Sequence, residues 1–294
     1  MKETFLNIAD YEIRVYTIDK SFSILLNENY SPFLTDKTKT PDVSIELICG
    51  IPDSFIKTTE IYKAKIDADE NNSEYFWSIN EMHDERILFT SNEGNDIFPF
   101  FALCFSNENR NWRLHFSKKY LKTRKSIDPF TYPLGPLILY YLTAFSNSIM
   151  IHGSGIRYNS EGYLFSGVSG VGKSTMAELW YTGGAQIIND DRLIIREIND
   201  RFYIYNTPMY YIDHPKKSSL DKIFLIKHGK TNISVKLNAI KAITMTMANC
   251  IHHSYNREIV ATLIESIGRL SEKIPIYELD FVPDQSIVNF IKSL

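Results

Sequence analysis

Several short segments in the first 130 residues alternate apolar and polar positions. Such alternation turns every second side chain toward one buried face, so it predicts β-strands rather than helices. Clusters of Asn, Asp, Gly and Ser between the segments are typical of turns. Many short strands with little helix predict a β-rich domain of antiparallel sheets. The segments with this pattern, or with a short apolar run, are 11–16, 43–47, 86–89, 97–105 and 112–116.

From residue 131 onward the chain mixes helical and strand patterns. The most apolar segment, 134–145, predicts a buried helix, because about a dozen residues fall short of the roughly 20 that cross a bilayer. The rest predicts an α/β domain at 131–294 after a β-rich domain at 1–130. The other expected strands are 149–152, 162–166, 185–189, 193–198, 202–205 and 222–226, and the expected helices are 175–181, 237–249 and 257–270.

Composition narrows the class of protein. A chain of 294 residues with 44% hydrophobic and 23% charged residues is ordinary for a globular protein and long enough for two domains. A net charge of −3 gives no electrostatic reason to bind nucleic acid or an anionic membrane. Three scattered cysteines and an N-terminus without a long apolar stretch predict a cytoplasmic protein that lacks a disulfide framework and a signal peptide.

The stretch GVSGVGKST, residues 167–175, fits the phosphate-loop pattern G-x-x-x-x-G-K-[ST]. An expected strand precedes it and an expected helix follows it, closed by Gly183-Gly184. Glycines let successive N–H groups point into one concavity, and the helix N-terminus adds partial positive charge there. A glycine-rich turn that binds nothing is the alternative. The stretch predicts a nucleotide-phosphate site formed by Gly167, Val168, Ser169, Gly170, Val171, Gly172, Lys173, Ser174 and Thr175.

Two residues of this loop have distinct expected roles. The ammonium group of Lys173 would reach the β- and γ-phosphates, and the hydroxyl of Ser174 would be a ligand of Mg²⁺. The expected bound species are therefore a nucleoside di- or triphosphate and Mg²⁺.

An acidic pair, Asp190 and Asp191, ends the apolar run that follows the loop helix. Ligands of open α/β sheets bind beyond the carboxyl ends of strands, so the pair should face the phosphates. One carboxylate would hold the metal, and the other could accept a proton from an attacking hydroxyl. Neighbouring residues of an extended chain point to opposite sides, so the two should differ in role. A surface turn is the alternative.

His152 is expected at the end of the strand that precedes the loop strand. Its imidazole could orient a carboxylate or stabilise charge near the transferred phosphate. A histidine after three aliphatic residues is also compatible with a core or strand-end position.

Taken together, His152-Gly153, the GVSGVGKS loop and the span from Gly184 to Asp190-Asp191 resemble the HPr kinase/phosphorylase family in order and spacing. The resemblance covers about 45 residues and none of the first 130. It implies a P-loop kinase domain of the HPr kinase/carboxykinase type that uses ATP and Mg²⁺. By position, Lys173 and Ser174 resemble the family's phosphate and metal residues, Asp190 its metal-side acid, Asp191 its base and His152 its active-site histidine. Members often form rings, so the resemblance also implies that a homo-oligomer is open to this chain.

The chain lacks the family's glycine-rich signature after the acidic pair, which supplies a metal-binding Glu and an active-site Arg. Arg192, Arg257 and Arg269 are the candidates to replace the arginine, and the sequence selects none of them. We therefore expect a Mg-ATP-dependent kinase acting on a hydroxyl of a protein, peptide or small molecule, selected by the N-terminal domain. Two alternatives stay open: an inactive nucleotide-binding regulator with a partner-binding N-terminal domain, and a decarboxylating kinase of the carboxykinase type.

Overall fold

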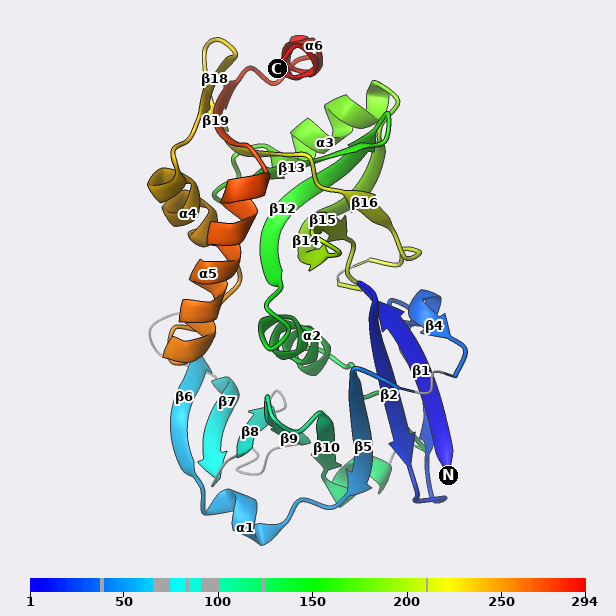
Figure 1. Cartoon of the computed structure of the whole chain (residues 1–294). Coiled ribbons are helices and arrows are strands. Elements are labelled where there is room, and N and C mark those ends of the chain that lie inside the picture. The colour runs from blue at the N-terminus through cyan, green and yellow to red at the C-terminus, as the bar shows by residue number, and fades with distance from the viewer. Residues whose placement is uncertain (38–39, 66–74, 83–84, 91–100, 123–124, 210) are drawn as a thin grey trace. The chain divides into compact units, whose positions relative to one another are not determined.

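The computed structural model of the protein describes residues 1–37, 40–65, 75–82, 85–90, 101–122, 125–209 and 211–294 (Figure 1). The expected strand residues 97–100 lie outside this set. The chain divides into two compact units, Met1–Leu139 with Tyr210–Asp213, and Tyr140–Met209 with His214–Leu294. Several sheets and several helices make it a mixed α/β structure.

The first unit is built on a nine-stranded sheet in the order β4-β1-β2-β5-β10-β9-β8-β7-β6. The expectation of purely antiparallel sheets is wrong at two places, because β2–β5 and β5–β10 are parallel pairs. Between β2 and β5 the chain makes a long excursion, so β5 re-enters the sheet in the same direction as β2. The strands are β1 (Lys2–Ile8), β2 (Tyr11–Thr17), β4 (Leu34–Thr35), β5 (Val43–Cys49), β6 (Thr59–Lys65), β7 (Tyr75–Met82), β8 (Glu85–Thr90), β9 (Phe101–Phe105) and β10 (Asn111–Phe116).

Smaller elements complete this part of the chain. Strands β3 (Ser23–Ile24) and β11 (Ser126–Ile127) pair with each other. The short helices are η1 (Ser31–Phe33), α1 (Asp53–Ile56) and η2 (Lys118–Lys122). The predicted apolar helix is confirmed as α2 (Leu134–Ala144).

The second unit contains an eight-stranded sheet in the order β16-β15-β14-β12-β13-β17-β19-β18. Only β13–β17 and β17–β19 are parallel among its pairs. The elements are β12 (Ile149–Tyr158), β13 (Glu161–Ser166), α3 (Lys173–Thr182), β14 (Gln186–Ile198), β15 (Arg201–Tyr205), β16 (Lys217–Ser219), β17 (Lys222–His228), β18 (Ile233–Lys236), α4 (Ala239–Met247), α5 (Arg257–Lys273), β19 (Ile276–Phe281) and α6 (Ser286–Lys292).

Two hydrophobic cores cover the two faces of this sheet. Strand β17 shows the alternation directly: Ile223 and Leu225 belong to the core shared with α4 and α5, and Phe224 and Ile226 to the core shared with α3 and α6. Alternating side chains of one strand thus serve both layers, as expected where helices pack on both faces. The sheet and the helices packed on it hold in place the loops that follow the strands.

Two strands are longer than the sequence predicts. His152 and the acidic pair, expected at strand ends, lie inside β12 and β14, which pair from Ile149↔Ile195 to Arg157↔Gln186 with one register shift, between Gly155 and Ile156. The polar residues look like a strand end in the sequence, but the ladder of backbone hydrogen bonds continues past them. Gly155 permits this close packing, since a Cβ there would lie 2.4 Å from Leu193 Cδ2.

His253, between α4 and α5, makes the stability of the protein depend on pH. Its ring packs 4.2 Å from the ring of Tyr140, and burial lowers its pKa to about 4. The unfolded chain, with a histidine pKa of about 6.5, binds the proton more readily, so stability is complete above pH 6.5 and falls as the pH drops toward 4. We expect a loss of roughly 3 kcal/mol by pH 4 from this residue.

Urea unfolding at a series of pH values measures this effect. His253→Phe should flatten the decline between pH 6.5 and 5, where carboxylates contribute little. The exposed His214 supplies the control, and His214→Phe should leave the decline as it is. An unchanged pH dependence in His253→Phe would show that His253 is not the group responsible.

Candidate functional site

The predicted strand–loop–helix unit is confirmed: β13 ends at Ser166, the loop occupies 167–172 and α3 begins at Lys173. Gly170 and Gly172 have φ of +78° and +95°, a left-handed conformation that glycine adopts without steric cost. A Cβ on Gly172 would also lie 2.9 Å from Phe281 Cζ. Backbone shape and space therefore both require glycine at position 172.

Lys173 is buried although it is charged, with 8% of its surface exposed. Its Nζ donates to the carbonyl oxygens of Gly167 and Val168, each at 3.0 Å, so it lies across the loop. Burial lowers the pKa of this ammonium group, and the charges of Asp190 and Asp191 oppose the shift. Acidic groups thus stabilise the charge of Lys173 at the place where the loop would hold phosphate.

A polar cavity of about 350 Å³ opens above the loop, within the size range of small-molecule sites. Most of the predicted site residues meet at its wall, and three do not. Val171 packs into the core, the side chain of Val168 is exposed, and Gly167 lies at the start of the loop. The cavity is lined by His152, Ser169, Gly170, Gly172, Lys173, Ser174, Thr175, Asp190 and Asp191.

His152 and Asp191 face each other across the β12–β14 pair, with 3.3 Å between Nε2 and Oδ1. Burial lowers the pKa of His152 and the charge of Lys173 lowers it further, while Asp191 opposes these effects. The hydroxyl of Ser166 donates to the backbone oxygen of His152 at 2.6 Å, which ties the start of the loop to this part of β12.

The two acids have different surroundings. Asp190 accepts a hydrogen bond from the hydroxyl of Ser154, a fully buried residue directly opposite it in the ladder. The Oδ2 atom of Asp191 is buried and accepts no hydrogen bond within the described ranges, and Arg192 Nε lies 3.7 Å away. One carboxylate is thus held by a hydroxyl, and the other has one oxygen beside His152 and one buried oxygen near Arg192.

Both acids line one cavity, although neighbouring residues of an extended chain point to opposite sides. Their ladder pairs, Gly153↔Asp191 and Ser154↔Asp190, are in regular register, and the β12–β14 ladder shifts only after Gly155↔Asn189. Ser154 was not among the residues predicted for the site. Ser154 lies two positions beyond His152, and residues two apart on a strand share one face. A strand expected to continue past His152 would therefore have placed Ser154 on the same face as the histidine.

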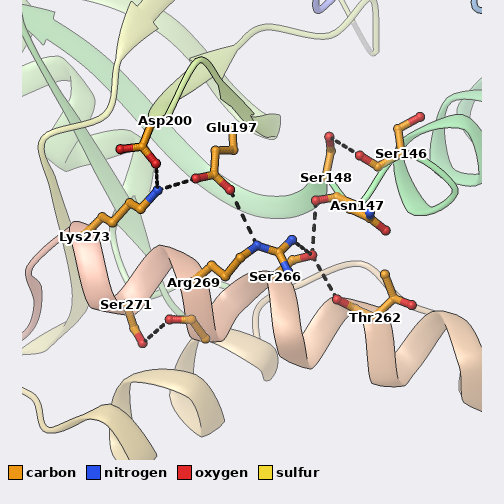
Figure 2. A network of polar contacts seen from close by, with 11 residues as sticks. Ser146, Asn147, Ser148, Glu197, Asp200, Thr262, Ser266, Arg269, Ser271 and Lys273 are labelled. Carbon is orange, nitrogen blue, oxygen red and sulfur yellow. Dashed lines mark hydrogen bonds and ion pairs between the residues drawn. The ribbon is translucent and has the colours of Figure 1, made fainter.

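Of the three candidate arginines, Arg192 lies near the acids, with its Nε 3.7 Å from Asp191 Oδ2. Arg269 instead lies 3.5 Å from Glu197 and donates to the hydroxyl of Ser266, in a polar network that joins α5 to the β14–β15 hairpin (Figure 2). In this network Lys273 pairs with Glu197 and Asp200. Arg269 therefore stabilises the contact between α5 and the β14–β15 hairpin.

The oxygen atoms at the cavity suit Mg²⁺ better than a metal ion whose ligands all come from the protein. No group of three or more His, Cys, Asp or Glu able to hold a metal occurs in the part of the chain that the structure describes. Mg²⁺ commonly takes one or two carboxylates and completes its shell with phosphate oxygens and water. Asp190 and the exposed hydroxyl of Ser174, both at the cavity, provide such a partial set.

Comparisons with known proteins add little. No family model matches the chain, and no curated protein matches it. Among solved structures, the Hpr(Ser) kinase/phosphatase from Coxiella burnetii is similar at 13% identity and a TM-score of 0.30, over 49% of this chain and 92% of that chain. A TM-score this low supports neither a shared fold nor a shared activity. Within the described ranges, no helix combines the length and apolarity needed to cross a membrane.

Proposed function

We propose that this protein is a Mg-ATP-dependent kinase that transfers the γ-phosphoryl group to a hydroxyl of a protein, peptide or small molecule. One observation carries the proposal: a single cavity brings Lys173 of the phosphate loop together with the Asp191–His152 pair. A protein that only binds nucleotide needs the loop and a metal-side acid but has no use for a second carboxylate paired with a histidine beside them. Phosphoryl transfer needs both an anion site and a proton acceptor.

The proposed step is an in-line transfer. The acceptor hydroxyl oxygen forms a bond to the γ-phosphorus, and the bond from that phosphorus to the β–γ bridging oxygen breaks, so ADP leaves with the electron pair. Asp191 takes the hydroxyl proton. His152, whose Nε2 lies 3.3 Å from Asp191 Oδ1, keeps the carboxylate oriented.

The remaining side chains neutralise charge. Lys173 faces the β- and γ-phosphates, and Arg192, next to Asp191, adds the positive charge that the family's missing signature would supply. Asp190 and Ser174 would hold Mg²⁺, which lowers the repulsion between the phosphate oxygens. Positioning and charge neutralisation account for most of the catalysis in such transfers.

The direct experiment combines titration of ATP by calorimetry in the presence of Mg²⁺ with transfer of radiolabelled γ-phosphate to proteins and peptides encoded near this chain's gene. We expect ATP binding and a labelled acceptor whose phosphate is stable to acid, as a serine ester is. The alternative is a nucleotide-binding regulator, which the missing signature favours. Tight binding without transfer to any acceptor or to water would establish that alternative and reject the kinase.

A further inference from the structure

Different strands of the sheet lie on the two sides of the phosphate loop. On one side of β13 lie β12 and β14, which carry His152 and the acids. On the other side lie β17 and β19, both parallel to β13, so all three strands end at the same edge of the sheet. The residues that end β17 and β19 are His228 and Phe281. These two residues therefore lie at the edge that carries the loop, on the side away from the acids.

His228 is an exposed residue held against the loop. Its Cε1 is 3.6 Å from the position that a Cβ of Gly172 would occupy. Its ring is stacked on the ring of Phe281, with 5.6 Å between centroids and 24° between planes, and Phe281 is fully buried. A buried ring thus supports an exposed one beside the phosphate loop, and an exposed ring with a fixed orientation is a surface on which a planar group can stack.

The backbone that follows His228 is held by hydrogen bonds to the end of β19 and the residues after it. Gly229 donates its N–H to the carbonyl oxygen of Phe281 at 3.0 Å. Asn232 accepts from the N–H of Val282 at 2.8 Å and donates to the hydroxyl of Ser286 at 3.0 Å, which joins the turn after β17 to the turn after β19. The backbone that carries the ring is therefore held before any ligand arrives, which reduces the entropy lost on binding.

We propose that His228, supported by Phe281, is the nucleoside-binding edge of this site and stacks on the base of the bound nucleotide. The proposal rests on the proposed function, because the reacting phosphate must face Asp191. A phosphate chain with one end at the acids leads its nucleoside to the opposite side of the loop, where β17 and β19 end. The ligand class is a nucleoside triphosphate, bound by ring stacking that tolerates any base.

The test compares ATP with inorganic tripolyphosphate, which has the phosphates and lacks the nucleoside. Dissociation constants of both are measured by calorimetry with Mg²⁺ for the wild type, His228→Ala, His228→Phe and His214→Ala. His214, exposed between β15 and β16, is the matched control. We expect His228→Ala to weaken ATP binding roughly 5- to 100-fold, the effect of losing one base–aromatic stack, and to change tripolyphosphate binding less than twofold. His228→Phe should restore most of the ATP affinity.

Unchanged ATP affinity in His228→Ala would overturn the proposal, and so would an equal loss for both ligands, since that would mean a distorted loop. The two proposals fail in different ways. A wild type that binds ATP through His228 but transfers no phosphate refutes the kinase and leaves the nucleoside edge intact. A wild type that binds neither ligand refutes both.

Discussion

Lys173→Ala is expected to lower the rate of phosphoryl transfer by about 100-fold or more, the scale observed when one preorganised charge-stabilising donor is removed. ATP affinity should fall as well, by roughly 10- to 100-fold, because a hydrogen bond to a charged group is lost. The structure gives the reason: Lys173 is buried at the wall of the cavity, and two acids stabilise its charge there. Calorimetry and initial rates of γ-phosphate transfer measure the two effects.

The conformation of the loop also depends on Lys173. Lys173 also bonds the carbonyls of Gly167 and Val168, so its removal could loosen the loop. Thermal melting without nucleotide separates this from direct loss of charge, since a direct effect leaves the transition of the free protein in place. The exposed Lys241 on α4 is the control, and Lys241→Ala should behave as the wild type. Full activity in Lys173→Ala would show that the loop does not hold the reacting phosphates.

The parts of the site that are formed by residues close together in the chain could be predicted from the sequence. Loop, strand and helix are contiguous between residues 161 and 182, and the glycine spacing reflects backbone conformation at Gly170 and Gly172. No information from elsewhere in the chain is needed to form them. This is why the strand–loop–helix unit was predicted correctly.

The positions of His152 and the acidic pair depend on pairing between distant segments. A polar run inside a strand has the same local pattern as a turn, and only the partner strand shows that the hydrogen bonds continue. The pairing of Ser154 with Asp190, and the contact of Arg192 with Asp191, follow from the register of β12 against β14. The parallel pairs β2–β5 and β5–β10 escaped prediction for the same reason, since direction is set by long connections.

Asp191→Asn is expected to lower phosphoryl transfer by about 100- to 10,000-fold, the range for loss of a general base, while ATP affinity changes only a fewfold. Asparagine has the size of aspartate but does not accept the proton at neutral pH. Asp191 lines the cavity, and His152 at 3.3 Å from Oδ1 fixes the orientation of the carboxylate. Single-turnover transfer from labelled ATP, with calorimetry on the same samples, measures rate and affinity separately.

The control is Asp200→Asn in the hairpin turn after β14, where the carboxylate pairs with Lys273 and lies in the polar network of α5 (Figure 2). This variant makes the same chemical change outside the cavity, so transfer should match the wild type. If Asp191→Asn loses ATP binding in parallel with transfer, Asp191 is a ligand of the metal rather than the base. If transfer in Asp191→Asn stays within tenfold of the wild type, no proton passes to this carboxylate in the rate-limiting step, and the assignment of the base is wrong. A loss of transfer with binding retained is the result expected if Asp191 accepts the proton.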